Sequence, residues 1–176
     1  MIKVCALVLA VQLAAPLDLR AVNQSRLDAN RTAMTVLASW ATANLVAGLG
    51  AFATDSPRWR AFFLGGAAWN VVNEVLAGVA LGSLVRSDPG ALDFQQSLNE
   101  GLGLEKTYLF NAGLDVAYLA AAGGLMLWGR LDDSPRLTGL GNALLLQGAF
   151  LLVFDSVMAL VIGGLNRPLV AAARPN

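Results

Sequence analysis

Four long apolar segments limit what this chain can fold into. They cover residues 33–54, 61–85, 107–129 and 137–165. Each segment reaches the ~20 residues that a helix needs to cross the hydrocarbon core of a bilayer. Apolar and polar residues do not alternate within them, and a backbone in lipid must satisfy its hydrogen bonds internally. The pattern therefore predicts four membrane-spanning α-helices and not the strands of a barrel.

Composition supports the membrane prediction and excludes several classes of function. The chain has 176 residues, of which 56% are hydrophobic and 14% are charged, whereas soluble proteins contain about 25% charged residues. Twelve basic residues balance twelve acidic ones, so we expect no nucleic-acid partner. Histidine is absent and Cys5 is the single cysteine. Haem, zinc and di-iron sites are thus disfavoured, and we expect no cofactor.

The two ends of the chain differ from its apolar middle. Residues 1–15 contain one lysine, an apolar run and an Ala-Ala ending. This layout is typical of a signal peptide and is too short to span a membrane, although an uncleaved interfacial segment is an alternative. Residues 16–32 are expected to form an amphipathic lead-in helix. The transmembrane domain is then 33–166, and residues 167–176 form a polar tail.

The links between the spans predict how the helices pair. The tetrapeptide Asp-Ser-Pro-Arg occurs at 55–58 and again at 133–136. A serine caps a helix well, and proline is tolerated at the first helical position, so both links should be tight turns. The link 86–106 is longer and acidic, and its residues 92–104 are expected to form a short surface helix over one mouth of the bundle. We therefore expect an all-α integral membrane four-helix bundle made of two hairpins.

Membrane orientation stays open at this point. A cleaved signal peptide would place the middle link and the C-terminus outside. The distribution of arginine and lysine favours the opposite arrangement, because basic residues collect on the cytoplasmic side.

Three carboxylic acids lie inside the predicted spans, at Glu74, Asp115 and Asp155. A charge at the centre of a membrane costs at least about 2.5–3.5 kcal/mol. No lysine, arginine or histidine lies within these spans to neutralise them. Each acid must therefore be protonated, hydrogen-bonded within the bundle or bound to a cation.

Counting residues from the membrane edge beside the middle link places Glu74, Asp115, Asp155 and Asn44 within roughly 5 Å of one another in depth. We therefore expect one polar layer to which every helix contributes. Helical spacing adds neighbouring polar and aromatic side chains on helices two, three and four. The candidate binding residues are Asn44, Asn70, Asn73, Glu74, Tyr108, Asn111, Asp115, Tyr118, Gln147 and Asp155.

Two functions fit such a layer. It is either a site for a proton, a hard cation or a small polar ligand, since oxygen ligands suit Na⁺, Ca²⁺ or Mg²⁺, or it is packing in a structural or accessory subunit. An enzyme is not expected, because no nucleophile–base pair or phosphate loop is present. The expected partner is the lipid bilayer. Homo-oligomerisation is left open, because one bundle of 18.4 kDa has little room for a pore.

Several strings carry a family resemblance. They lie at 23–31 (NQSRLDANR), 34–44 (MTVLASWATAN), 69–73 (WNVVN), 109–118 (LFNAGLDVAY) and 146–155 (LQGAFLLVFD). Together they resemble an uncharacterised family of small bacterial four-helix membrane proteins that begin with a signal-like segment. The resemblance implies a bacterial inner-membrane location and no particular activity. The family's loop before its second helix carries a histidine that this chain lacks.

Overall fold

The computed structural model describes residues 17–174, in which every regular element is a helix. Its elements are α1 (Leu19–Ala47), the short 3₁₀ helix η1 (Gly48–Phe52), α2 (Pro57–Leu84), α3 (Phe94–Leu131) and α4 (Pro135–Ala172). No strand occurs within residues 17–174. The predicted signal peptide, with Cys5, lies outside the described residues.

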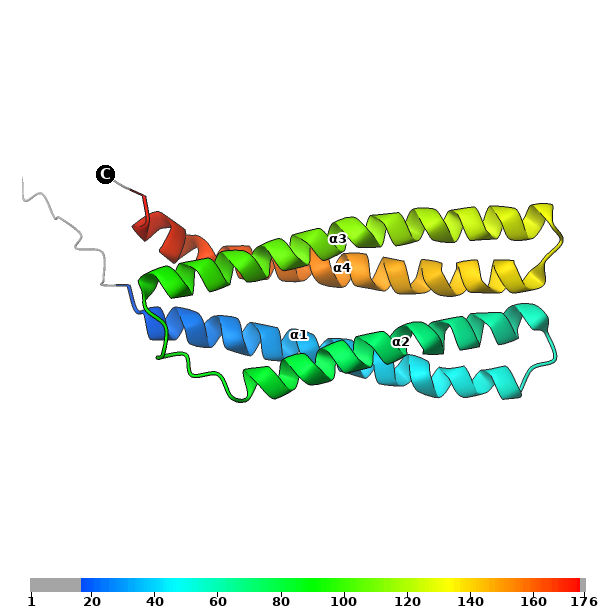
Figure 1. The fold of residues 1–176 in the computed structure, drawn as a ribbon, viewed down its shortest axis with the longest axis horizontal. Helices are drawn as coiled ribbons and strands as arrows, with labels where there is room; N and C mark the ends of the chain where they lie inside the picture. The colour runs from blue at the N-terminus through cyan, green and yellow to red at the C-terminus, as the bar shows by residue number, and fades with distance from the viewer. Residues whose placement is uncertain (1–16, 175–176) are drawn as a thin grey trace, which may run out of the picture.

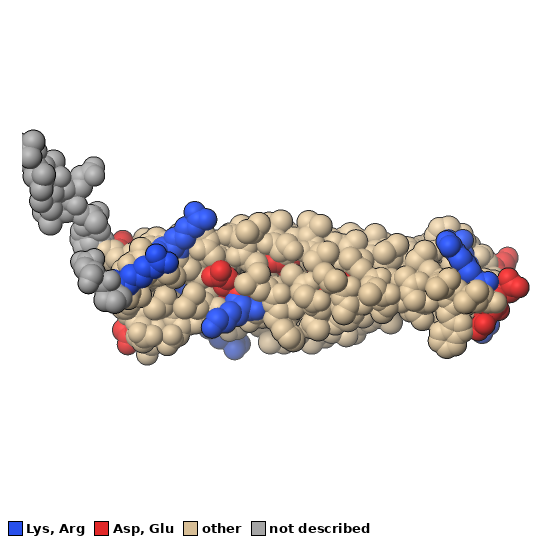
Figure 2. Space-filling view, turned by 90° about the horizontal axis from the view of Figure 1, so that it is seen from above, with Lys and Arg blue, Asp and Glu red and all other residues tan. Residues whose placement is uncertain are grey.

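The helices form one elongated bundle (Figure 1). α1 lies along α2, α3 lies along α4, and α2 also packs against α4. The two tight links lie at one end of the bundle, and the middle link lies at the other end with the start of α1 and the end of α4. All four helices are long and apolar enough to cross a membrane. In the face shown in Figure 2, charged side chains gather mainly towards the two ends.

The predicted helix starts at the repeated tetrapeptide are confirmed. The Ser56 hydroxyl oxygen accepts a hydrogen bond from the Trp59 amide, and Pro57 is the first residue of α2. The Ser134 hydroxyl does the same for the Leu137 amide at the start of α4. Each serine thus satisfies a free amide at the helix start, where proline has no amide to lose.

Three helices run further than the sequence pattern suggested. The lead-in and the first span form the single helix α1, which gives way to η1 at Gly48. The predicted surface helix at 92–104 is wrong, because α3 is continuous from Phe94. Asp93 precedes the first residue of α3 and forms a capping box, in which its carboxylate accepts a hydrogen bond of 2.8 Å from the backbone N–H of Gln96. α4 continues to Ala172, so residues 167–172 of the predicted tail are helical.

Glycines bring the helices into close contact near the tight turns. A Cβ atom at Gly139 of α4 would overlap the carbonyl oxygen of Arg58 in α2. A Cβ atom at Gly129 of α3 would lie 2.6 Å from the amide nitrogen of Thr138. Neither position leaves space for a side chain, so the backbones touch directly. This end of the bundle is called the closed half below.

Candidate functional site

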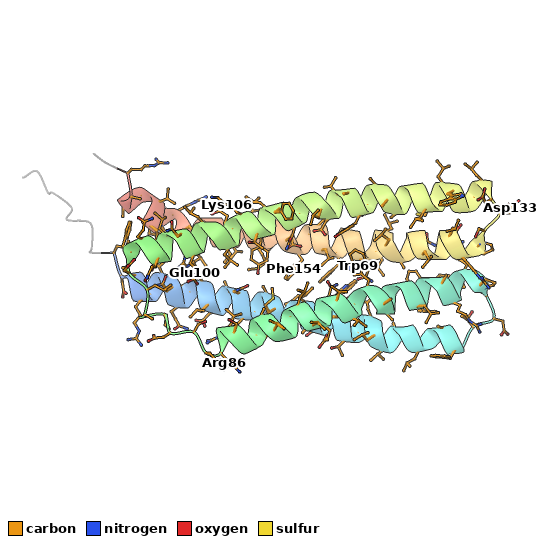
Figure 3. The ribbon with its side chains drawn as sticks, viewed as in Figure 1. Trp69, Arg86, Glu100, Lys106, Asp133 and Phe154 are labelled. Carbon is orange, nitrogen blue, oxygen red and sulfur yellow. The ribbon has the colours of Figure 1, made fainter. Side chains whose placement is uncertain are left out.

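α2 and α3 do not pack against each other anywhere along the bundle, and an opening lies between them beyond the closed half. No Cα atom of α2 comes within 8 Å of a Cα atom of α3. A cavity of about 450 Å³ fills this space, with residues of α1 and α4 at its base. Trp69 of α2 and Phe154 of α4 point into it (Figure 3). We call this cavity the lateral cleft.

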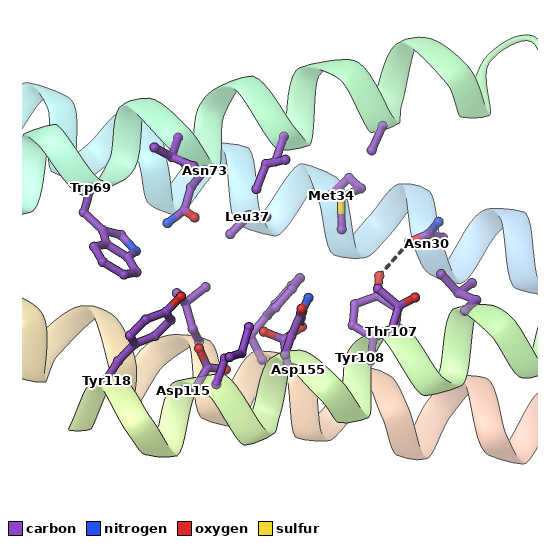
Figure 4. Close-up of a pocket in the computed structure, with 18 residues that line it drawn as sticks. Asn30, Met34, Leu37, Trp69, Asn73, Thr107, Tyr108, Asp115, Tyr118 and Asp155 are labelled. Atoms are coloured by element: carbon purple, nitrogen blue, oxygen red, sulfur yellow. Dashed lines mark hydrogen bonds between the residues drawn. The ribbon is translucent and has the colours of Figure 1, made fainter. Parts of the chain in front are cut away.

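Two carboxyl groups meet at the base of the lateral cleft (Figure 4). Asp115 of α3 is 2% exposed and Asp155 of α4 is 4% exposed, and the two groups lie within hydrogen-bonding reach of each other. The Asn111 amide donates to Asp155 Oδ1 at 3.5 Å. Asp115 Oδ2 is buried and receives no hydrogen bond from any N–H or O–H donor in the described chain.

Aromatic rings flank the carboxyl pair on both sides along the bundle. Trp69 and Tyr118 meet edge to face with ring centroids 4.8 Å apart. Tyr108 and Phe154 lie on the other side, with centroids 6.3 Å apart. The Tyr108 hydroxyl donates to Asn30 Oδ1 of α1 at 2.6 Å, as the dashed line in Figure 4 shows.

None of the described residues that line the lateral cleft is lysine or arginine. The carboxyl pair therefore has no basic partner in the cleft. A buried negative charge without a partner is costly, so a proton or another cation must reduce it.

The structure separates Asn44 from the acids and corrects the predicted single layer. Asn44 Oδ1 accepts a hydrogen bond of 2.9 Å from the Gln147 amide, and Gln147 Oε1 accepts one of 2.8 Å from the Trp40 indole. The Asn44 amide donates to the Trp40 carbonyl. Gln147 lies eight residues before Asp155, which is about 12 Å along a helix. We call Asn44, Gln147 and Trp40 the amide cluster.

Glu74 also lies apart from the carboxyl pair. Its carboxylate accepts a hydrogen bond of 3.2 Å from Thr42 of α1, and it does not line the lateral cleft. Successive residues of a helix point about 100° apart, so the neighbouring Asn73 faces the cleft while Glu74 does not. Asn70 is fully buried and donates to the Gly66 carbonyl of its own helix.

Six of the ten candidate residues therefore meet in the cleft and four do not. The residues that line the cleft are Asn73, Tyr108, Asn111, Asp115, Tyr118 and Asp155. The residues outside it are Asn44, Asn70, Glu74 and Gln147. The sequence pattern missed Asn30, which lines the cleft from α1.

A second polar cluster near the middle link was also missed. Arg26 of α1 is 4% exposed and donates to the backbone carbonyl of Ser97 in α3 and to the Asn23 side chain. Asn23 donates in turn to the Ser97 hydroxyl at 3.0 Å. Asn166 of α4 donates to the Gly101 carbonyl and to Glu105. The spacing of Asn23, Arg26 and Asn30 at three and four residues was the available signal, since it puts them on one helix face.

One comparison with known proteins supports the expectation of an uncharacterised family. The model of a family of unknown function, DUF6992, matches residues 36–156. This range contains the carboxyl pair, the amide cluster and both tight turns. Comparison with curated proteins and with solved structures gives no match. The chain belongs to DUF6992, a family of unknown function.

Proposed function

We propose that this chain is an integral membrane protein whose Asp115–Asp155 pair is a buried site for a proton or a small cationic or polar ligand. The contact between the two acids in a cleft without basic residues carries the proposal. The four apolar helices support the membrane location. A bacterial inner membrane is the location that the family resemblance implies.

The chemistry follows from the contact between the two acids. Two carboxyl groups within hydrogen-bonding reach do not both ionise at low cost, so one proton is held between them. The pair then carries one negative charge in a largely apolar surrounding. This charge attracts a cation, and the shared proton can leave or return as the pH changes. The pair therefore suits reversible exchange of positive charge, as intramembrane acids do in proton relays.

A structural or accessory subunit is the second candidate, and the amide cluster favours it. Asn44, Gln147 and Trp40 form hydrogen bonds with one another. Such bonds between helices contribute about 0.6 kcal/mol each on average. If the carboxyl pair had the same role, it would only hold α3 to α4. The two candidates therefore differ in whether the pair reacts with anything outside the protein.

Labelling with dicyclohexylcarbodiimide tests the proposal, because this apolar reagent modifies protonated carboxyl groups in lipid. The protein in lipid nanodiscs is treated across a range of pH, and the modified residue is identified by mass spectrometry. We expect label on Asp115 or Asp155, with a labelled fraction that falls as the pH rises. The D115N/D155N variant should lose this label.

Glu74→Gln is the matched control, since Glu74 is a carboxylic acid in α2 that lies outside the cleft. Its substitution should leave the labelling of the aspartates unchanged. An absence of label on both aspartates at every pH, in a folded protein, would contradict the proposed site and favour the structural role.

A further inference from the structure

We propose that the lateral cleft binds an amphipathic organic cation, with one positive head group and an apolar tail, that enters from the lipid between α2 and α3. This inference rests on the proposed function and names the class of ligand that the carboxyl pair takes. Four features of the cleft carry it: its charge, its size, its aromatic lining and the position of its opening.

The charge of the site selects a monovalent cation. The two carboxyl groups share one proton and leave a single negative charge at the base of the cleft. No arginine or lysine among the cleft residues offsets that charge. Asp115 Oδ2 is buried, and no N–H or hydroxyl group of the described residues donates to it, so apart from the shared proton it is free to accept from a ligand. One positive head group neutralises the pair and satisfies this atom if it carries an N–H.

The size of the cleft favours an organic molecule over a metal ion. A volume of about 450 Å³ lies within the range of small-molecule pockets, roughly 300–1,000 Å³. A hard metal cation needs many close oxygen ligands, and Ca²⁺ for example takes about six to eight. Within residues 17–174, no cluster of three or more acidic or cysteine side chains is suitably placed for a metal. Most of the space is therefore available to the apolar part of a ligand.

The lining matches both parts of such a molecule. The rings of Trp69 and Tyr118 lie beside the carboxyl pair, where their faces can attract a positive charge. Met34, Leu37 and Leu151 provide apolar contact for the tail. An anion would meet the negative pair, and a small hydrophilic ion would gain nothing from this apolar lining.

The opening lies on the side of the bundle that would face lipid. Val72 and Leu76 of α2 line the cleft at its edge and are 59% and 58% exposed. Leu114 of α3 lines it from the opposite helix and is 37% exposed. The rim is apolar, and the backbones of α2 and α3 do not pack against each other there, which gives a lipid-dissolved molecule direct access.

The experiment compares two probes that share a tail and differ in charge. Binding of radiolabelled dodecyltrimethylammonium to the protein in nanodiscs is measured against empty nanodiscs, below the concentration at which the probe forms micelles. Dodecyldimethylamine oxide, which is uncharged at neutral pH, is the matched probe. We expect saturable binding of the cation and binding of the amine oxide that is weaker by at least about tenfold.

Variants then locate the binding. The D115N/D155N variant should lose the preference for the cation, because it has no charge at the base of the cleft. Glu74→Gln should keep it. Carbodiimide labelling of the wild-type pair should fall when dodecyltrimethylammonium is bound, since the bound cation covers the acids and keeps the reagent away from the shared proton.

The route of entry has its own matched pair of variants. Leu76→Trp adds bulk at the rim of the cleft, whereas Val79→Trp adds the same bulk at an exposed position of α2 outside it. Slower association in Leu76→Trp alone supports entry between α2 and α3. Equal association rates in the two variants would overturn the lateral route.

The outcomes separate this inference from the proposed function. If the aspartates react with carbodiimide but the cation and the amine oxide bind equally, the ligand class is wrong and the proton or small-ion site stands. If the aspartates do not react and the cation shows no saturable binding, both proposals fail. Cation binding that persists unchanged in D115N/D155N would place the ligand elsewhere and overturn the inference.

Discussion

The amide cluster and the carboxyl pair are both polar groups in the middle of apolar helices, yet they differ in how completely they are bonded. In the amide cluster, the Gln147 amide oxygen and nitrogen both find partners on α1. In the carboxyl pair, Asp115 Oδ2 finds no donor among the described residues, and a cavity adjoins it. Hydrogen bonds within the protein satisfy both polar atoms of the Gln147 side chain, whereas they leave one carboxyl oxygen of Asp115 without a donor in the described part of the chain. The completeness of bonding, and not polarity alone, is what distinguishes packing from a binding site in this bundle.

The closed half should be the part of the molecule that tolerates change least. Gly139→Ala places a methyl group against the carbonyl oxygen of Arg58. Because neither backbone can move without disturbing the α2–α4 contact, we expect a loss of about 2–3 kcal/mol in the free energy of unfolding. Unfolding in mixed detergent micelles, followed by tryptophan fluorescence, measures it.

Gly113→Ala is the control for that change, because a Cβ atom at Gly113 of α3 would meet nothing within 4 Å. It should be neutral or stabilise the helix by up to about 1 kcal/mol. Equal losses in the two glycine variants would show that the closed half is not packed as described.

Gln147→Leu tests whether bonding in the amide cluster is needed for stability. The substitution keeps most of the side-chain volume but leaves the Trp40 indole N–H and Asn44 Oδ1 without their partner. We expect a loss of about 1–3 kcal/mol in the same unfolding measurement, from buried polar groups left unpaired. Cation binding in the lateral cleft should stay the same. A stable Gln147→Leu protein would remove the contrast between the two polar groups.

The carboxyl pair should show the reverse behaviour, with a small effect on stability and a large effect on binding. Amides replace both carboxyl groups in D115N/D155N with little change of shape, and two amides can bond to each other. The free energy of unfolding should change by less than about 1 kcal/mol, which the same micelle titration can follow. A large loss of stability would mean that the pair mainly holds α3 to α4.

Local features of the fold could be predicted from the sequence, whereas the direction of side chains could not. Ser56 and Ser134 each accept a hydrogen bond from an amide only three residues further along the chain. The helix starts could therefore be predicted from the local sequence. The depth count brought Asp115 and Asp155 together correctly, because both lie on the same pair of antiparallel helices. It could not reveal that Glu74 faces Thr42, since depth carries no information on which way a helix is rotated.

The cluster around Arg26 was missed for a different reason. An arginine in a polar segment is usually at the surface, and only the packing of α1 against α3 shows that Arg26 is buried. The continuity of α3 was missed because its first residues are polar and glycine-containing. Bonds to α1 and α4 at Ser97 and Gly101 hold this part of the helix in place.

In a bilayer, the distance between the tight turns and the carboxyl pair would place the pair in one half of the membrane. α2 has 28 residues, whereas α3 and α4 have 38 each, so the longer pair extends past α2 at the end that carries the middle link. Asp115 lies 16 residues from the last residue of α3, Leu131 (131 − 115), which is about 24 Å of helix. If the tight turns lie at one surface of a hydrocarbon core of about 30 Å, the pair would lie nearer to the opposite surface. A molecule dissolved in the membrane would then reach the cleft from a single leaflet. The protein would therefore bind molecules of that leaflet in preference to those of the other.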